Sequence, residues 1–315
     1  MTTQRTPATA DSKAKSKIVV TIAGTHDADT KFVSDVQEAG ANHETKTRVA
    51  VVPRFIVEVD DPSIYLKLAE KEALQKIVIR KVQDEILRVG VDGMVLEMSD
   101  AWHVVTAQGK DPKLRNQLNA FVMRLGEALH LHTGVNSPKQ LIVVVRPFRT
   151  HSADFQNFDY KQVEKFVDGF SLMTYDHPSP MSGGPQSPLG WMKDSVTALV
   201  GAESIKDARK MRKVMMGLPF YGMRYAPNGE VGPEPILGRT LIEELTAEPS
   251  AVATWHTDSA EQSFALARSS KGRAETIFYP SLQFLQKRLS LAKELGVSIS
   301  IWELGQGLDF FYDLL

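Results

Sequence analysis

The chain has 315 residues, with 37 Lys and Arg against 38 Asp and Glu, so its formal net charge is −1. A hydrophobic content of 43% and a charged content of 24% are ordinary for a globular protein, which excludes the collagen-like and disordered classes. The near-zero charge gives no electrostatic reason to expect nucleic acid or an anionic membrane as a partner. Because the chain has no Cys, it forms neither disulfides nor thiolate zinc sites, and we expect no cofactor.

The N-terminal 16 residues are polar and basic, and they predict a disordered tail. They contain no apolar stretch of the kind found in a signal peptide, so the sequence as written indicates a cytoplasmic protein. No run of about 18 apolar residues follows, and we therefore expect no membrane span.

Short apolar runs alternate with amphipathic segments along the rest of the chain. The runs lack clean alternation of polar and apolar residues, as expected of parallel strands covered on both faces. The predicted strands are 17–23, 48–57, 91–98, 140–146, 169–175, 213–219 and 297–302, and the predicted helices include 71–90, 111–133 and 281–296. Seven such strands, without a Gly-x-Gly-x-x-Gly after the first, favour a TIM (β/α)8-type barrel over an open nucleotide-binding sheet.

Residues 223–280 interrupt this alternation with a segment rich in Pro and Gly. The segment ends in another short apolar run, at 276–279. We predict a small α+β insertion here, before the last strand, and a barrel built from residues 17–222 and 281–315.

Barrel active sites lie at the carboxyl ends of the strands, where this chain places several aromatic and acidic residues. Alternation along 91–98 puts Val95, Glu97 and Ser99 on one face of the strand, after Asp92. The residues that end the later strands are Met173, Tyr175, Asp176, Tyr221, Trp302 and Glu303. Taken singly, a Tyr or Trp in such a place packs the core more often than it binds a ligand. Together, flat aromatic faces and carboxylates are typical of a sugar-binding site.

Four motifs make this pattern specific: Asp-Gly-x-x-x-Glu on a strand, then DGFSLMTYD, GLPFYG and SIWELGQG in that order. With them the sequence resembles the family 18 glycoside hydrolases, which are chitinase-type TIM barrels. The resemblance covers residues 21–315. It implies a barrel that binds oligosaccharides containing N-acetylglucosamine.

The resemblance also implies that the catalytic motif is degenerate. Active members of the family carry Asp-Gly-x-Asp-x-Asp-x-Glu, whose last Glu protonates the glycosidic oxygen while the sugar's own acetamide attacks the anomeric carbon. Here the four positions are Asp92, Val95, Glu97 and Ser99. A serine hydroxyl cannot serve as the general acid at neutral pH, and losing acid–base assistance costs roughly 10²–10⁴-fold in rate. The chain is therefore expected not to hydrolyse its ligand.

The binding half of the family's site is retained. By resemblance, Met173, Tyr175 and Asp176 line the sugar site, Trp302 is its floor and Tyr221 is a further aromatic wall. The carboxylates of Glu97 and Glu303 complete the expected ligand-binding set. Together they predict a non-catalytic, chitin-binding lectin. Two alternatives stay open: a residual glycosidase that uses Glu97 or Asp100 as its acid, and a barrel that presents a surface to a protein receptor.

The family's first two strands have no clear counterpart in this sequence. We therefore expect the chain as given to lack the first βα unit and part of the second, together with any signal peptide. A longer form of the protein would then be secreted or lysosomal, as the resembled family suggests.

Overall fold

The computed structural model describes residues 29–42, 49–57, 61, 63–107, 112–131, 138–147, 159–179, 183–226, 233–267, 269 and 271–315. The predicted tail at 1–16 and the predicted strand at 17–23 lie outside these residues. So does the side chain of Asp100, although its backbone is described.

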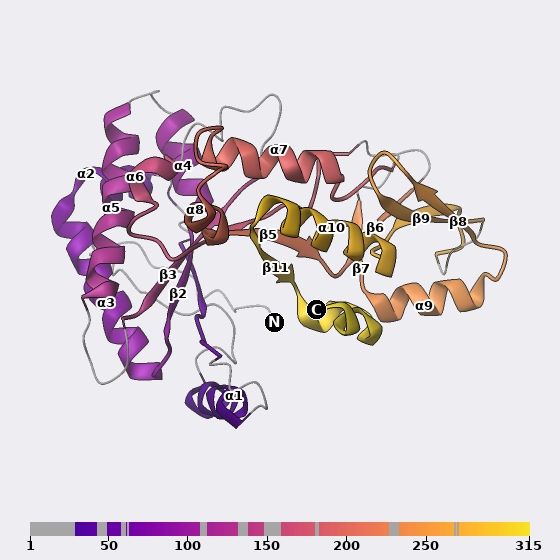
Figure 1. Ribbon diagram of the computed structural model, residues 1–315, viewed down its shortest axis with the longest axis horizontal. Coiled ribbons are helices and arrows are strands. Elements are labelled where there is room, and N and C mark those ends of the chain that lie inside the picture. The colour runs from indigo at the N-terminus through magenta and orange to yellow at the C-terminus, as the bar shows by residue number, and fades with distance from the viewer. Residues whose placement is uncertain are drawn as a thin grey trace, which may run out of the picture.

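A six-stranded parallel sheet forms the centre of the molecule, in the order β1-β2-β3-β4-β5-β11 (Figure 1). Its strands are β1 (Arg54–Ile56), β2 (Gly93–Glu97), β3 (Gln140–Val145), β4 (Gly169–Leu172), β5 (Val214–Pro219) and β11 (Ser298–Trp302). Neighbours in the sheet follow one another along the chain, as in a TIM barrel, and this confirms the α/β fold class. Over the described residues the sheet does not close, because β1 and β11 are its two edges.

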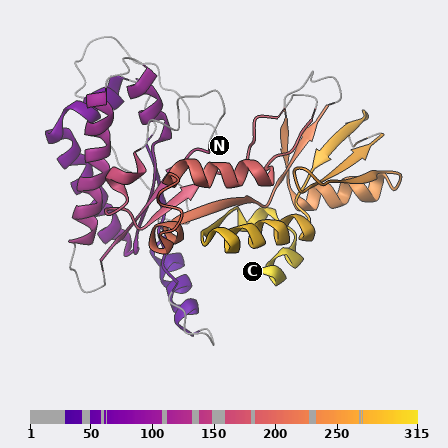
Figure 2. The same ribbon diagram turned by 45° about the horizontal axis from the view of Figure 1, so that its top comes forward.

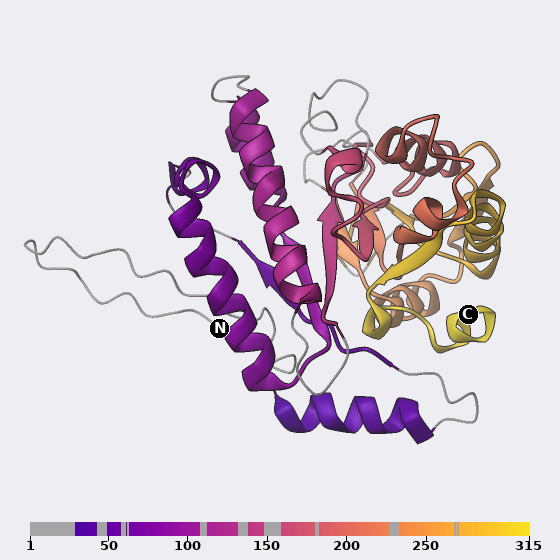
Figure 3. The same ribbon diagram turned by 60° about the vertical axis from the view of Figure 1, so that its left-hand side comes forward.

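Helices connect the parallel strands and cover the sheet. They are α1 (Thr30–Asn42), α2 (Ser63–Glu70), α3 (Glu72–Val89), α4 (Ser99–Ala107), α5 (Pro112–His130), α6 (Tyr160–Val163), α7 (Leu189–Val200), α8 (Ala208–Lys213) and α10 (Leu282–Leu295). The long helices α3 and α5 run side by side, and α1 lies crosswise to them (Figure 3). None of the helices in the described part of the chain is long and apolar enough to cross a membrane.

The predicted helices 71–90, 111–133 and 281–296 are confirmed as α3, α5 and α10. Two of them end at a glycine in the left-handed conformation, Gly90 with φ 81° and Gly296 with φ 68°. The Gly90 N–H donates to the Ile86 carbonyl at 3.0 Å, which satisfies one of the carbonyl groups left free at the end of the helix.

A second sheet lies between β5 and α10 in the chain, at the end of the molecule away from α3 and α5 (Figure 2). It is antiparallel, with the strand order β7-β6-β10-β9-β8. Its elements are β6 (Gly222–Tyr225), β7 (Glu234–Ile236), α9 (Gly238–Ala247), β8 (Val252–His256), β9 (Glu261–Leu266) and β10 (Glu275–Phe278). The exact division of the chain into barrel and insertion stays a prediction.

Two clusters of buried apolar side chains fill the molecule. The larger lies under the parallel sheet and includes Leu96, Val143 and Phe170, whereas the smaller lies at the second sheet and includes Phe220 and Ile277. Helix α10 contributes to both clusters, and Ile301 of β11 packs against both. The chain then closes with two short 3-10 helices, η2 (Leu304–Gln306) and η3 (Asp309–Leu314).

Candidate carbohydrate site

A cavity of about 1190 Å³ opens at the carboxyl ends of the parallel strands. Its lining brings together eight of the residues singled out from the sequence: Val95, Glu97, Met173, Tyr175, Asp176, Tyr221, Trp302 and Glu303. These residues come from β2, from the segment after β4, from the end of β5 and from β11. Parallel strands end at the same side of the sheet, and this brings residues up to 208 positions apart in the sequence (95 to 303) into one wall.

Two tyrosines and one carboxylate form the polar side of the cavity. The Tyr221 hydroxyl donates to Asp176 Oδ1 at 2.5 Å, and the rings of Tyr175 and Tyr221 meet edge to face with centroids 6.3 Å apart. Burial, reinforced by the charge of Asp176, raises the pKa of both phenols well above the ordinary value. Both hydroxyls therefore keep their protons at neutral pH, and the Tyr221 hydroxyl uses its single proton in the hydrogen bond to Asp176.

Tyr175 fits against β5 only because the neighbouring residue there is a glycine. A Cβ on Gly217 would lie 2.8 Å from the Tyr175 ring and 2.6 Å from the Leu172 carbonyl oxygen. The buried Thr174 hydroxyl donates to the Gly217 carbonyl at 2.8 Å and ties the same two segments together. Close packing of β4 and β5 thus fixes the direction of the Tyr175 ring.

Arg54 of β1 is a cavity residue that the sequence analysis did not single out. Its Nη1 donates to Glu97 Oε2 at 3.1 Å, and its guanidinium carbon lies 4.8 Å from the centroid of the Trp302 ring. The Trp302–Glu303 peptide bond is cis, and the Trp302 side chain is 38% exposed. The available signal was a charged residue inside an otherwise apolar predicted strand, at 48–57.

Ser99 and Asp92 are not part of the cavity lining. Alternation predicted Ser99 on the face of Val95 and Glu97, but β2 ends at Glu97 and Ser99 begins α4, so the two-residue period stops before it. Asp92 is buried and accepts hydrogen bonds from the Val51 N–H at 2.9 Å and from Gln37 Nε2 at 2.8 Å. Its carboxylate therefore holds β2 to the segment before β1 and to α1.

Part of the cavity lining is apolar. It is formed by Val36, Val51, Val95, Val144 and Ile301. The family's motif places a carboxylate where this chain has Val95, so this part of the lining lacks the charge that an active site would carry there. Among the described residues, no cluster of His, Asp and Glu is arranged to hold a metal ion.

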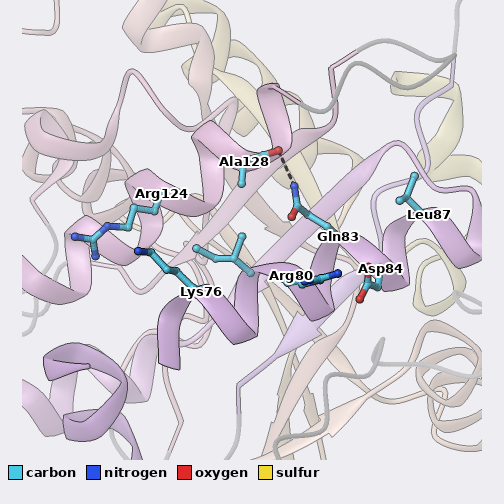
Figure 4. Close-up of a pocket in the computed structure, with 8 residues that line it drawn as sticks. Lys76, Arg80, Gln83, Asp84, Leu87, Arg124 and Ala128 are labelled. Atoms are coloured by element: carbon cyan, nitrogen blue, oxygen red, sulfur yellow. Dashed lines mark hydrogen bonds between the residues drawn. The ribbon is translucent and has the colours of Figure 1, made fainter. Parts of the chain in front are cut away.

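A second hollow, of about 450 Å³, lies on the outer surface between α3 and α5 (Figure 4). Gln83 spans it, and its Nε2 donates to the Ala128 carbonyl at 3.0 Å. Lys76, Arg80 and Arg124 give it a basic rim. None of the residues predicted to bind a ligand lines this hollow, so the cavity at the strand ends is the candidate site.

The chain belongs to the glycosyl hydrolases family 18, whose family model matches residues 6–307. The match spans both sheets and all the residues of the candidate site.

Solved structures of chitinases share the fold at low sequence identity. A chitinase from Chromobacterium violaceum ATCC 12472 superposes with a TM-score of 0.71 at 17% identity, over 90% of this chain and 82% of that one. A class V chitinase from Pseudomonas fluorescens Pf-5 superposes with a TM-score of 0.66 at 20% identity, over 90% of this chain and 83% of that one. A mutant class V chitinase from Nicotiana tobaccum, in complex with NAG4, superposes with a TM-score of 0.65 at 14% identity, over 89% of this chain and 81% of that one.

Proposed function

We propose that the protein is a non-catalytic, chitin-type lectin that binds oligosaccharides containing N-acetylglucosamine in the cavity at the strand ends. One observation carries the proposal: the aromatic residues Tyr175, Tyr221 and Trp302 line a single cavity whose catalytic motif lacks its terminal acid, with Ser99 outside the lining. Aromatic faces stack on the apolar faces of sugar rings, while phenols and carboxylates hydrogen-bond to the hydroxyls. The class V chitinase from Nicotiana tobaccum, which shares the fold, was solved in complex with NAG4.

The first test measures binding and hydrolysis together. Chitotetraose titrated by calorimetry should bind with a Kd of roughly 10 μM to 1 mM, which corresponds to a binding free energy of about −7 to −4 kcal/mol. Trp302→Ala should abolish most of this binding, with circular dichroism and a melting curve showing that the variant is folded. Parent-like affinity in folded Trp302→Ala would show that this cavity is not the glycan site.

Hydrolysis is measured with a fluorogenic chitobioside. The lectin proposal expects no release of the fluorophore above that of a heat-inactivated control. Turnover on the order of 1 per second, as in an ordinary enzyme, would contradict it.

A residual glycoside hydrolase is the alternative from the enzyme class, and Glu97 is its best candidate acid because it lies in the cavity. However, Glu97 accepts a hydrogen bond from Arg54, whereas a general acid has to donate a proton to the glycosidic oxygen. This geometry favours the lectin. Loss of any weak hydrolysis in Glu97→Gln would favour the enzyme instead.

Two finer assignments are proposals that rest on the sequence motifs. The order of DGFSLMTYD, GLPFYG and SIWELGQG suggests that, within the family, this chain is similar to the stabilin-interacting, chitinase domain-containing proteins. A protein receptor would then be a second partner besides the glycan. The cellular compartment stays a prediction.

A further inference from the structure

Arg54 lies in the mouth of the cavity and bridges two residues of the proposed glycan site. It donates to Glu97 at 3.1 Å and lies over the Trp302 ring at 4.8 Å. Arg54 belongs to β1 and Trp302 ends β11, and these strands are the two edges of the six-stranded sheet. The contact therefore spans the mouth from one edge of the sheet to the other.

Arg54 and Trp302 both line the cavity, so the contact between the guanidinium and the indole belongs to its wall. Trp302 is 38% exposed, and the side chain of Arg54 is 34% exposed, so a ligand can reach the pair from solvent. A guanidinium and a sugar ring use the same aromatic face for cation–π contact and for stacking. The guanidinium and a sugar ring therefore cannot occupy the same face of Trp302 at the same time.

We propose that Arg54 is a specificity-determining residue that occupies the stacking face of Trp302 and has to be displaced before a neutral sugar ring can stack there. For its ligand the inference rests on the proposed function, whereas the shielding of Trp302 by Arg54 does not. Displacement breaks the cation–π contact and loosens the ion pair with Glu97. Every neutral ligand that stacks on Trp302 bears this cost, so Arg54 lowers the affinity of the site.

If Arg54 instead contacted the ligand directly, removing Arg54 would change the affinity in the opposite direction. A guanidinium has five N–H donors, and in place it could donate to sugar hydroxyls or to an acetamide carbonyl. Arg54 would then strengthen binding, and its removal would weaken it. The direction of the change in affinity therefore distinguishes a competitor of the ligand from a contact to the ligand.

The test replaces Arg54 by Met, which keeps a long aliphatic stem and removes the charge and the donors. Arg54→Met should bind chitotetraose about 2- to 30-fold more tightly than the parent, which is the range that one cation–π contact covers. Arg54→Lys keeps a cation over the ring and should stay close to the parent. Arg80→Met, on the outer surface between α3 and α5, is the matched control and should leave the affinity unchanged.

A further variant distinguishes the effect of uncovering the Trp302 ring from the effect of leaving Glu97 without its cation. Arg54→Met leaves Glu97 without its cation, so the double change Arg54→Met with Glu97→Gln restores the balance of charge in the mouth. Because Glu97 belongs to the proposed binding set, the double variant is compared with Glu97→Gln alone, and the same tightening is expected in that comparison. Unchanged or weaker binding in both comparisons, with melting curves like those of the reference proteins, overturns the proposal.

A measurement without ligand keeps the inference separate from the lectin proposal. Acrylamide quenching assigned to Trp302, by difference from Trp302→Phe in each background, should rise when Arg54 is removed. If neither the parent nor any variant binds oligosaccharide, the proposed function fails, and the quenching measurement alone then decides whether Arg54 shields Trp302. Unchanged quenching of Trp302 then overturns the shielding by Arg54, and increased quenching supports it.

Discussion

At the scale of single residues, the wall of the cavity depends on phenols that keep their protons. Burial, with the nearby Asp176 charge, raises the pKa of Tyr221 and of Tyr175 above the ordinary value of about 10. Between the ordinary pKa and the raised one, the unfolded chain loses these protons while the folded chain keeps them. The stability that they contribute is therefore complete below about pH 10 and falls as the pH rises further.

Tyr221→Phe tests this alkaline dependence. The parent should lose stability above pH 10, by up to about 1.4 kcal/mol per pH unit for each such tyrosine. The variant has one ionisable phenol fewer, so its free energy of unfolding should fall less between pH 9 and pH 11. Urea unfolding of both proteins at the two pH values measures the difference, and an equal fall in both would contradict the assignment.

The site residues at strand ends could be predicted from the sequence, whereas Arg54 could be placed in the site only from the three-dimensional structure. Tyr175, Asp176 and Tyr221 follow parallel strands and Trp302 ends one, and the structure brings all four to one cavity. Their role in binding stays a prediction. Arg54 was missed because alternation shows that a residue faces inward but not that it reaches Trp302 across the open edge of the sheet.

At the scale of elements, the contact between β4 and β5 positions Tyr175. Gly217 in β5 leaves the space that the Tyr175 ring fills, next to the Leu172 carbonyl. The limits of these elements were less predictable than their existence. The predicted strands 91–98 and 169–175 are shorter in the structure, where they span Gly93–Glu97 and Gly169–Leu172.

Gly217→Ala should push the Tyr175 ring out of place. Its Cβ would meet a backbone oxygen at 2.6 Å, and neither strand can move away freely, so we expect a loss of about 1–3 kcal/mol in stability. Weaker binding of chitotetraose should accompany this loss. Gly190→Ala is the matched control, because its Cβ meets nothing within 4 Å and alanine favours helix α7.

Urea unfolding and calorimetry on the two glycine variants separate the outcomes. A folded Gly217→Ala protein with the stability and affinity of the parent would show that Tyr175 does not depend on this packing.

At the scale of the whole molecule, a buried ion pair joins the second sheet to the barrel. Arg288 of α10 is fully buried and lies 3.6 Å from Glu261 of β9, and it donates to the Ala260 carbonyl at 2.8 Å. Glu261 in turn accepts the backbone N–H of Ser187, before α7, at 2.7 Å. Burial lowers the pKa of Arg288 to about 9 against the opposing charge of Glu261, and burial likewise raises the pKa of Glu261 against the charge of Arg288.

This network explains how two sheets with separate apolar clusters hold together. Helix α10 packs against α7 and η3, and it contributes side chains to both clusters. The sequence predicted this helix from its leucines and its terminal glycine. It could not predict the pair, because Glu261 and Arg288 come from different elements and only the fold shows that both are buried.

Arg288→Met should therefore uncouple the second sheet from the barrel. It leaves the Glu261 carboxylate buried without its cation, which costs about 3–5 kcal/mol. In hydrogen exchange, peptides from β8 and β9 should lose protection before those from β2 and β3, whereas the parent should open as one cooperative unit. Lys193→Met breaks only the exposed pair of Lys193 with Glu294, and as the control it should keep the exchange pattern of the parent. If β8 and β9 stay as protected in Arg288→Met as in the parent, the buried pair does not join the two sheets, and the apolar packing of α10 alone holds them together.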